Sequence, residues 1–455
     1  NYGLNYLKNA YDKISDKVIN ANIKGLPFNT KPYEIFDFNG FKVGCIGFTT
    51  VYIPNWEQEA NIKDLEFLDV VKQYAKYEKE LKENCDFIIV CYHGGFEKSL
   101  DENMKVCCVV KANAYGCGAV EVAKYLENKN IDFLAVARIE EALELRNSHI
   151  SLPILILGYT DISIVDKAIE NDISLTVYNR KYAIEVDKIA KQLNKKAKVH
   201  IKLDTGMSRL GFIAENAINS IDEINKLDNI YIEGIFTHFA KADEKDKTDT
   251  LCQLKRYKNV INQLDDLNID IPIKHVANSA TILDMSNDLF NMVRAGIILY
   301  GYYPSDEVNK NVNLKPCFKL KSTVTNVKVL DENVGISYGY TYKTEEKCKI
   351  VTISIGYADG FNRIQHNPKI SINGQILNIV GRICMDQCMA KAPLDMEINV
   401  GDEVILIDND IKELTLEENA KRNDTINYEV LCMINRRVAR VYNCDNKIYS
   451  VNYLL

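Results

Sequence analysis

The feature of this sequence that most restricts its fold is a regular alternation between residue 106 and about residue 300. Short apolar runs are separated there by amphipathic stretches such as "AVEVAKYLEN" and "AIEVDKIAKQLN", whose apolar residues recur with helical spacing. The runs occupy residues 106–110, 133–137, 153–158, 173–178, 198–203, 232–239, 273–277 and 292–300. Strands that alternate with helices form parallel sheets with right-handed crossovers. Eight such units predict an α/β fold of the (β/α)8 barrel, or TIM, type.

The pattern changes on both sides of this region. From about Leu314, closely spaced β-runs such as "KLKSTVTNVKVL", "KIVTISIGYADG", "KISINGQILNIVGRICM" and "DEVILID" predict a mostly antiparallel domain, and "DTINYEVLCMINRRV" predicts a short helix. Before the barrel, "FKVGCIGFTT" and "CDFIIVCYHGG" are strand-like and flank a charged helix, "FLDVVKQYAKYEKELKENC". We therefore expect an N-terminal α/β segment at 1–103, a barrel at 104–308 and a β domain at 309–455.

Composition excludes several classes of partner. The net charge is -7 and no run of Lys and Arg is long enough to follow a phosphate backbone, so nucleic acid is not expected as a partner. No apolar stretch approaches the roughly 20 residues of a membrane-spanning helix. The 13 cysteines are an odd number and mostly isolated, which predicts reduced core thiols and a cytoplasmic location. The start, "NYGLNYLKNAYDK", has no initiator methionine and no signal-peptide core, so we expect it to be a fragment edge.

Polar residues gather where the predicted barrel strands end. Lys111, Lys202 and His238 end the first, fifth and sixth strands, Asn278 and Ser279 follow the seventh, and Arg294 lies in the eighth. The working groups of barrel enzymes stand at the carboxyl ends of the strands. These residues are therefore expected to share one mouth and to form an active site, with no metal.

Nine motifs along residues 104 to 443 resemble the bacterial alanine racemases, which are fold-type III pyridoxal phosphate (PLP) enzymes. In chain order they are "VVKANAYGCG", "HIKLDTGMSRLG", "THFAKAD", "HVANSA", "VRAGIILYG", "SYGYTY", "IGYADGF", "GRICMDQ" and "INYEVL". The resemblance implies interconversion of L-alanine and D-alanine, with D-alanine used for peptidoglycan. Lys111 would bind PLP covalently and, once freed by substrate, act as a base with a lowered pKa.

A racemase needs a second acid/base group on the opposite face of the substrate. The resemblance implies that Tyr338 has this role and reaches the barrel of a partner subunit, so that a homodimer with shared sites is required. A hydrogen-bond chain would run from Tyr338 through His238 to Arg294 on the pyridine nitrogen. Many PLP enzymes place a carboxylate beside the pyridine nitrogen. An arginine in that place stays protonated and leaves the nitrogen unprotonated, so the ring withdraws electrons less strongly and side reactions are suppressed.

The remaining roles also follow from the resemblance. Arg209 would stand near the ring hydroxyl, positioned by a carbamylated Lys202; a plain surface pair of Lys202 with Asp204 is the alternative. Substrate binding would involve Arg209 together with the partner's Tyr357, Met385 and Asp386. PLP would be held by Lys111, Tyr115, Asn278, Ser279, Arg294, Gly296, Ile297 and Tyr428.

Several alternatives stay open at this point. Broader specificity, for example toward serine or lysine, is compatible with the motifs, because a pocket distinguishes one methylene by only ~1–3 kcal/mol. A non-catalytic PLP-binding protein of the single-barrel kind would lack the second domain. An inactive fusion that only binds PLP is also possible. Cys117 stands where the family usually has histidine. Either the cysteine is tolerated as a small buried residue, or it weakens the hold on the phosphate group of PLP.

The first hundred residues resemble the middle of a calcineurin-like metallophosphoesterase of the 5′-nucleotidase type, in "FKVGCIGFTT", "PYEIF" and "CDFIIVCYHGGFE". His93 matches one metal-ligand position, but a two-metal site needs several His and Asp ligands. We expect this truncated segment to be catalytically inactive. It meets the racemase-like region near Ser99–Met104 without a linker, as in a gene fusion or an assembly artefact, and it replaces the family's usual first strand and helix.

Overall fold

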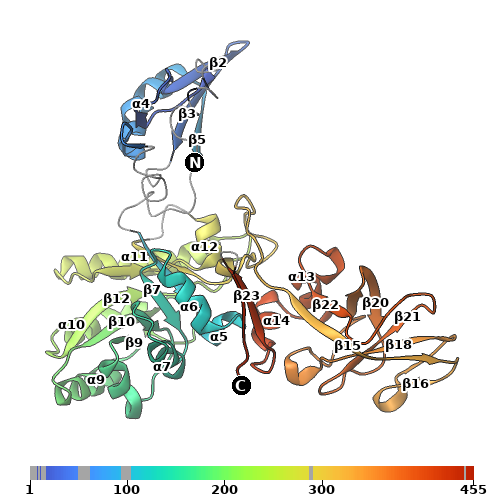
Figure 1. The fold of residues 1–455 in the computed structure, drawn as a ribbon. Helices are drawn as coiled ribbons and strands as arrows, with labels where there is room; N and C mark the ends of the chain where they lie inside the picture. The colour runs from blue at the N-terminus through green and yellow to red at the C-terminus, as the bar shows by residue number, and fades with distance from the viewer. Residues whose placement is uncertain are drawn as a thin grey trace. The chain divides into compact units, whose positions relative to one another are not determined.

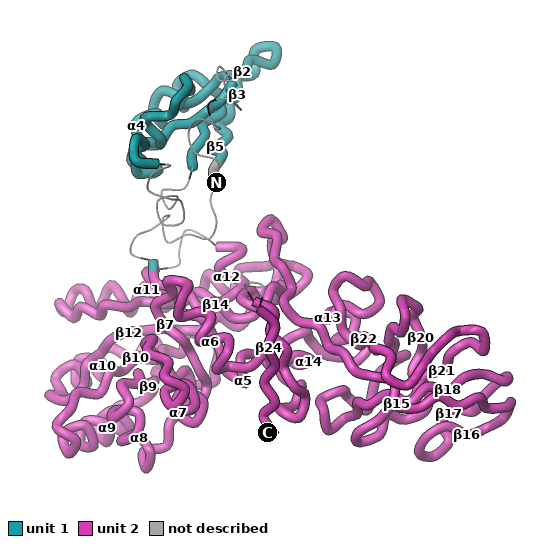
Figure 2. Tube along the Cα trace, in the orientation of Figure 1, with its two compact units in different colours: residues 1–104 teal, residues 105–455 magenta. Residues whose placement is uncertain are grey.

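The structure is a computed structural model that describes residues 8, 11, 17–49, 62–93, 104–285, 290–444 and 447–454. The chain forms two compact units, residues 1–104 and residues 105–455 (Figure 2). The predicted junction at Ser99–Met104 lies outside the described residues except for Met104. The finer boundary between 308 and 309, inside the second unit, stays a prediction.

The first unit is a small α/β segment. Strand β2 (Tyr33–Phe38) pairs antiparallel with β3 (Phe41–Thr49), which pairs parallel with β5 (Phe87–His93). Helix α4 (Val70–Asn84) connects β3 to β5, and Ile46, Phe48 and Leu81 are buried between them. A short pair, β1 (Ile23–Lys24) with β4 (Glu66–Phe67), completes it. The sequence predicts β3, β5 and α4, whereas β1, β2 and β4 were not predicted. The side chain of His93 lies outside the described part.

The second unit begins with a barrel of eight parallel strands (Figure 1). Neighbours follow chain order from β6 to β13, and β14 returns to pair with β6. Backbone hydrogen bonds from Arg294 N–H to Ala277 C=O (3.1 Å) and from Asn291 N–H to Lys274 C=O (3.2 Å) join the last two strands. The strands are β6 (Lys105–Val109), β7 (Phe133–Val136), β8 (Ile154–Ile156), β9 (Ile173–Val177), β10 (Ala197–Asp204), β12 (Ile230–Phe236), β13 (Ile273–His275) and β14 (Met292–Ala295).

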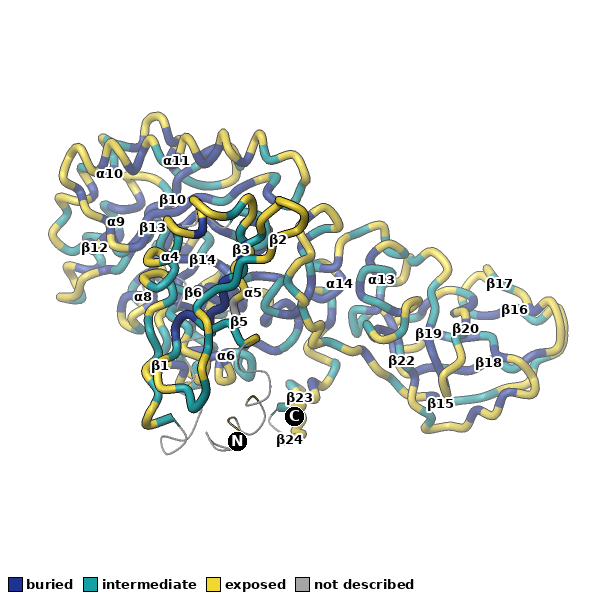
Figure 3. The backbone as a smooth tube through the Cα atoms, turned by 90° about the horizontal axis from the view of Figure 1, so that it is seen from above, coloured by how far each residue is buried: buried dark blue, intermediate teal, exposed yellow. Residues whose placement is uncertain are grey.

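Helices separate these strands along the chain and pack around the barrel. Their inner faces are buried, as Ala183, Val186 and Ala190 are on α9, while the outer faces of α10 and α11 are exposed (Figure 3). The helices are α5 (Lys111–Tyr115), α6 (Ala119–Glu127), α7 (Ile139–Asn147), α8 (Val165–Glu170), α9 (Arg180–Gln192), α10 (Ala217–Asn225), α11 (Thr248–Asp266) and α12 (Ser279–Asp284). The predicted (β/α)8 fold is thereby confirmed.

A closed antiparallel β-barrel follows in the same unit, in the order β15-β18-β21-β20-β19-β22. Its strands are β15 (Leu320–Leu330), β18 (Cys348–Ile353), β19 (Lys369–Ile372), β20 (Gln375–Ile379), β21 (Cys388–Ala392) and β22 (Glu403–Ile407). The predicted antiparallel domain is confirmed, although β21 was not predicted. A small hairpin, β16 (Gly335–Ile336) with β17 (Tyr342–Lys343), brackets the turn that carries Tyr338.

The chain then returns to the first barrel. Helices α13 (Leu416–Arg422) and α14 (Asn427–Met433) lead to a hairpin, β23 (Arg440–Cys444) with β24 (Lys447–Val451), that was not predicted. Arg440 is buried, and its guanidinium donates to the carbonyl of Gly116 from Nε (3.0 Å) and Nη2 (2.9 Å). The hydroxyl of Tyr442 donates to the carbonyl of Cys117 (2.9 Å). The end of the chain thus holds the loop that follows Lys111.

None of the thirteen cysteines, which all lie in the described residues, forms a disulfide, as predicted. Only Cys107, Cys108, Cys348 and Cys388 are buried, so the expectation that they are core thiols in general is wrong. Within the described residues, every helix is too short or too polar to cross a membrane.

Candidate active site

Lys111 stands at the carboxyl end of the first barrel strand, two residues beyond the last residue of β6. The chain then makes a left-handed turn, with φ of 54°, 56°, 54° and 51° at Ala112, Asn113, Ala114 and Tyr115. This conformation costs non-glycine residues roughly 1–2 kcal/mol each and persists only where the surroundings enforce it. Lys111 is therefore presented by a strained segment.

Two side chains from elsewhere and one of its own hold this segment in place. The carboxylate of Glu141 accepts from the backbone N–H of Ala112 (2.6 Å), and the side-chain oxygen of Asn113 accepts from Ala119 N–H (2.9 Å). The guanidinium of Arg440 holds the Gly116 carbonyl, as described above. These bonds compensate the strain and fix the direction of the lysine.

Burial lowers the pKa of Lys111, and the nearby cations Arg209 and Arg294 lower it further, while Cys432 and Glu141 act in the opposite sense. An amine with a lowered pKa is neutral for more of the time at working pH and can accept a proton. Lys111 therefore has the electrostatic setting of a base or nucleophile.

Lys202 lies inside β10 and is buried, with Nζ donating to the carbonyl of Leu203 (3.0 Å). Burial, followed by repulsion from Arg294 and Arg209, lowers the pKa of Lys202 to about 7. The carboxylate of Asp204 accepts instead from the backbone N–H groups of Gly206 and Ser208. The alternative of a plain surface pair between Lys202 and Asp204 is therefore wrong.

Arg294 extends from β14 into the barrel and is almost wholly buried. Its Nη2 donates to the carbonyls of Thr237 (2.8 Å) and Val276 (3.0 Å) and lies 3.3 Å from Nδ1 of His238. Burial lowers the pKa of Arg294 to about 10. Burial and the charge of Arg294 also hold the pKa of His238 well below its usual range, so this imidazole is neutral.

Tyr115, Ser279 and Gly296 converge from three parts of the barrel. The N–H of Gly296 donates to Oγ of Ser279 (3.0 Å), and the ring of Tyr115 lies 6.0 Å from that of Tyr428. Ile297 follows Gly296 and is buried. The side-chain oxygen of Asn278 accepts from Thr281 N–H (3.0 Å) and caps α12. Hydroxyls and backbone N–H groups at such a mouth suit a phosphate.

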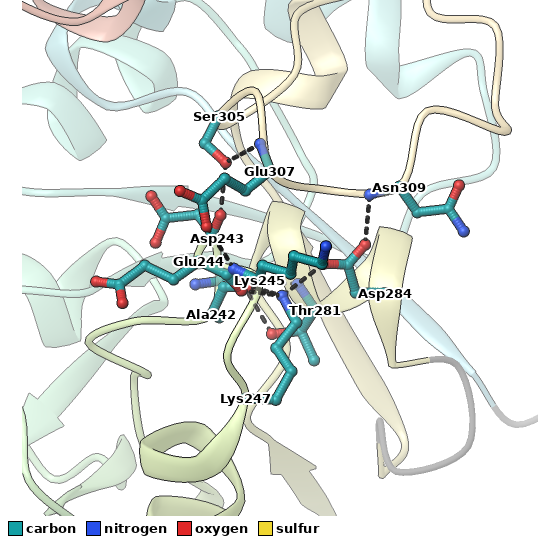
Figure 4. A network of polar contacts seen from close by, with 11 residues as sticks. Ala242, Asp243, Glu244, Lys245, Lys247, Thr281, Asp284, Ser305, Glu307 and Asn309 are labelled. Carbon is teal, nitrogen blue, oxygen red and sulfur yellow. Dashed lines mark hydrogen bonds and ion pairs between the residues drawn. The ribbon is translucent and has the colours of Figure 1, made fainter.

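A polar network braces the loop that follows His238 against α12 and the segment leading to the second domain (Figure 4). Nζ of Lys247 donates to the carbonyls of Ala242 and Glu244 (both 2.7 Å) and to Asp284 (2.5 Å). Asp284 also accepts from the backbone N–H of Asn309 (2.8 Å). The network thus ties together the elements that carry His238 and Ser279.

Of the predicted residues of the second domain, Tyr428 contacts this cluster through Tyr115, whereas the other four are not joined to it. Tyr338 and Met385 are exposed, Tyr357 is largely exposed, and Asp386 pairs with Arg437 (2.8 Å). Among the described residues of this chain, no hydrogen bond links Tyr338 to His238. The barrel mouth thus gathers Lys111, Lys202, Arg209, His238 and Arg294, while the second domain presents its tyrosines outward.

Sequence reasoning missed several polar residues of the barrel. His200, His275 and Glu233 form a hydrogen-bonded chain from Arg294, and Glu141 and Arg440 support the lysine segment. In "KVHIKL", strand alternation places His200 and Lys202 on the same face, which was a usable signal. Cys117 is half-buried, and a hydrogen bond with Cys317, together with burial, raises the pKa of its thiol well above its usual value.

The fold and site define a class: a barrel enzyme with a lysine-centred, cation-rich mouth and an appended antiparallel β domain. Family models for the alanine racemase N-terminal and C-terminal domains match residues 96–304 and 317–442. The chain belongs to the alanine racemase family, which confirms the resemblance drawn from the nine motifs.

Individual relatives agree with this assignment. The chain is 49% identical over 341 residues to an alanine racemase of Methanococcus maripaludis, covering 74% of this chain and 91% of the relative. A solved alanine racemase structure from Clostridium difficile 630 superimposes with a TM-score of 0.76 at 52% identity, covering 78% of this chain and 93% of that one. An alanine racemase from Bacillus anthracis with bound L-Ala-P has a TM-score of 0.74 at 35% identity, with the same two coverages.

Proposed function

We propose that this protein interconverts L-alanine and D-alanine with PLP as cofactor, by a two-base mechanism that uses Lys111 and Tyr338. The observation that carries the proposal is the half-buried amine of Lys111, with its lowered pKa, at the barrel mouth beside Arg209 and Arg294. Membership of the family makes the protein an isomerase that acts on an amino acid.

The residues at the mouth fit PLP. Tyr115, Ser279, Gly296, Ile297 and Tyr428 would hold the phosphate, Asn278 would support Ser279, and Lys111 would bind the aldehyde carbon. A Cβ on Gly296 would lie 3.0 Å from the Tyr115 hydroxyl and 3.3 Å from Oγ of Ser279, so the glycine leaves open the space that these groups face. When bound, PLP supplies an electron-withdrawing ring that acidifies the Cα–H of the amino acid.

Arg294 supports a racemase over other PLP chemistries. Its guanidinium is buried among carbonyls and a neutral histidine, and its pKa of about 10 keeps it protonated at neutral pH. A protonated arginine facing the ring nitrogen leaves that nitrogen unprotonated and limits charge delocalisation. With PLP bound, this arrangement would favour return of the proton to Cα over transamination.

The second base would come from a partner subunit. Tyr338 is 67% exposed on the hairpin of the second domain, and Tyr357 and Met385 are about half exposed, as a surface that meets another subunit requires. In the proposed homodimer, Lys111 takes the Cα proton on one face and Tyr338 of the partner returns one on the other. Arg209 with the partner's Tyr357, Met385 and Asp386 would bind the substrate.

The test is an absorbance spectrum of the protein with PLP, followed by measurement of D-alanine formed from L-alanine. Lys111→Ala is expected to abolish the PLP band, and Tyr338→Phe to abolish racemisation with the band retained. Tyr340→Phe is the matched control, because Tyr340 lies on the same turn and is 68% exposed. A PLP band in the wild type without racemisation would instead support the non-catalytic or inactive-fusion alternatives.

Substrate breadth is tested in the same assay with serine and lysine. Equal rates with serine and alanine would establish the broader-specificity alternative.

We further propose that Lys202 is carbamylated, since a buried amine with a pKa of about 7 is neutral enough to react with CO2. The carbamate would then face Arg209.

We also propose that the product serves peptidoglycan synthesis in the cytoplasm. Thirteen cysteines without a disulfide suit a reducing compartment. Growth of a D-alanine auxotroph without added D-alanine, when it expresses this chain and not the Lys111→Ala variant, would support the role. Failure of both to grow would oppose it.

For the first unit, we propose a catalytically inactive remnant of a calcineurin-like metallophosphoesterase. The parallel pair β3 and β5, connected through α4, is the kind of βαβ unit that such α/β folds contain. The test is hydrolysis of bis(p-nitrophenyl) phosphate with Mn²⁺. A rate above background that is lost in His93→Ala would overturn the proposal.

A further inference from the structure

A chain of polar side chains crosses the inside of the first barrel, starting at Arg294. Nη1 of Arg294 lies 2.9 Å from Nδ1 of His275, whose Nε2 lies 2.9 Å from Nδ1 of His200. Nε2 of His200 lies 3.1 Å from Oε2 of Glu233, which also accepts from the hydroxyl of Ser174 (2.5 Å). His200 and His275 have no exposed surface. Ser174 stands at the start of β9, so the chain ends toward the amino-terminal side of the barrel.

Only one arrangement of protons satisfies every link. A guanidinium only donates, so Nδ1 of His275 must accept, and the neutral ring then donates from Nε2. Nδ1 of His200 accepts that proton, and Nε2 of His200 donates to the carboxylate of Glu233. All the N–H bonds therefore point away from Arg294 and toward Glu233. The series is polarised in one direction and ends on a negative charge.

The barrel interior provides room for the imidazole rings of His200 and His275. The pairing of β10 with β12 shifts register between Val199 and His200. Opposite His200 stands Gly234, where a Cβ would lie 2.3 Å from Nδ1 of the imidazole. The ring of Phe236 stacks on His275 with centroids 4.8 Å apart and planes 11° apart. Any side chain at position 234 would displace His200, so the backbone and the packing hold both rings in place.

Arg294 lacks a direct counter-charge. Its contacts are the carbonyls of Thr237, His275 and Val276 and the nitrogens of two histidines, and within the described residues it forms no ion pair with a carboxylate. A buried cation is costly unless an opposite charge balances it. The hydrogen-bonded series leads from Arg294 to such a charge at Glu233.

We propose that Glu233 is the remote counter-charge of Arg294, acting through His200 and His275, and that these three are positioning residues for the guanidinium. The part of this inference that concerns the cofactor rests on the proposed function, because Arg294 would face the ring nitrogen of PLP. Glu233 thereby helps to keep that arginine oriented and protonated from the other side of the barrel.

The ionisation of Glu233 supports this inference. Burial opposes ionisation, but the hydrogen bond from His200, the hydroxyl of Ser174 and the nearby Lys198 together lower the pKa of Glu233. Burial and Arg294 hold the pKa of His275 well below its usual range, which keeps this ring neutral and able to accept from Arg294.

The test is Glu233→Gln, which keeps the shape and an acceptor oxygen but removes the charge. The first readout is the ¹⁵N NMR spectrum of the histidine rings in the full-length protein without PLP, which the presence of only six histidines makes tractable. We expect the ring nitrogens of His200 and His275 to shift. The control is Glu185→Gln on the outer face of α9, which should leave them unchanged.

The second readout is catalysis with PLP. Glu233→Gln is expected to lower kcat about tenfold, with KM changed less than about twofold, and to raise the ratio of transamination to racemisation. If Glu233→Gln does not fold, Ser174→Ala is the second variant, because it removes the hydroxyl that donates to Glu233. The carboxylate is then less stabilised, so its protonation, seen in the His200 signals, should occur at a higher pH.

Unchanged ring signals for both histidines, or a kcat equal to that of Glu185→Gln, would overturn the inference. Failure of the proposed function is distinguishable, because it would remove PLP binding or racemisation from the wild type. The ¹⁵N shifts in the cofactor-free protein would not be affected by that failure.

Discussion

Gly296 and Tyr115 approach each other so closely that a Cβ added to Gly296 would stand 3.0 Å from the phenolic oxygen. Oγ of Ser279 would be 3.3 Å from the same Cβ. Contacts this short force the neighbouring groups to move, although φ at this glycine does not itself require glycine. Glycine at position 296 is therefore explained by the space that it leaves free at the proposed binding site for the PLP phosphate.

Gly296→Ala is expected to weaken PLP binding by about tenfold or more, equivalent to about 1.4 kcal/mol, because the methyl group occupies that space. Fluorescence titration of the protein with PLP measures the change. Far-UV circular dichroism and thermal melting without PLP control for folding. An unchanged dissociation constant would remove Gly296 from the phosphate site.

The shared-site dimer predicts complementation between two inactive variants. A mixed dimer of Lys111→Ala and Tyr338→Phe contains one site in which both bases are intact. Random mixing after co-refolding should therefore restore about one quarter of wild-type activity per chain, because half the dimers are mixed and each has one good site. Racemisation that stays at zero in the mixture, with mixed dimers shown by mass spectrometry, would contradict the arrangement.

Lys202 is expected to carry a carbamate that depends on pH. The neutral amine is the form that reacts with CO2, so the modification should increase as the pH rises through about 7. A ¹³C NMR signal from protein incubated with ¹³C-bicarbonate reports it. The signal should disappear in Lys202→Met and persist in Lys198→Met, which removes an exposed lysine from the same strand. A signal that persists in Lys202→Met would assign the carbamate to another amine.

Buried neutral histidines predict acid sensitivity. The pKa values of His238 and His275 are held well below 6.5 in the folded protein. Below about pH 6.5 the unfolded chain binds protons that the folded chain does not, so the free energy of unfolding falls as the pH falls. The slope is about 1.4 kcal/mol per pH unit for each histidine. It should be visible in urea denaturation between about pH 6.5 and about pH 5.

The control for this slope uses a histidine on the surface. His238→Asn should reduce the slope, whereas His366→Asn should leave most of it, because His366 is exposed and pairs with Asp424. Equal slopes in both variants would show that His238 is protonated in the folded state.

Arg440→Met is expected to destabilise the protein by about 3 kcal/mol or more, because the carbonyls of Gly116, Ile434, Asn435 and Val438 lose their donor. Arg436→Met removes a half-exposed ion pair with Glu144 and should cost less than about 1 kcal/mol. Urea denaturation compares the two. A smaller loss for Arg440→Met than for Arg436→Met would contradict the assigned role.

The barrel strands could be predicted because each combines an apolar run with a helical spacer. Strand β21 was missed since its sequence, "CMAKA", contains small residues and a lysine, and its partners β18 and β20 come earlier in the chain. The final hairpin was missed for a similar reason: β24 is largely exposed and has no apolar alternation to reveal it.

The candidate site was predictable where residues follow strand ends. Lys111 and His238 have that position, Arg294 lies within the last barrel strand, and family motifs surround each of them. Glu233 and His275 were missed because their importance depends on contacts across the barrel interior, between strands that are distant in sequence. Arg440 lies 324 residues beyond Gly116, and local patterns carry no information about that contact.

The dependence of the Lys111 segment on Arg440 has a consequence for biosynthesis. A ribosome makes Lys111 long before Arg440, and the two are separated by most of the barrel and the whole antiparallel domain. During translation, the left-handed turn lacks the guanidinium that holds its last carbonyl. The nascent chain therefore completes the support of the Lys111 segment only when its final helix and hairpin have emerged. A protein arrested shortly before residue 440 would have a folded barrel in which this segment lacks one of its supports.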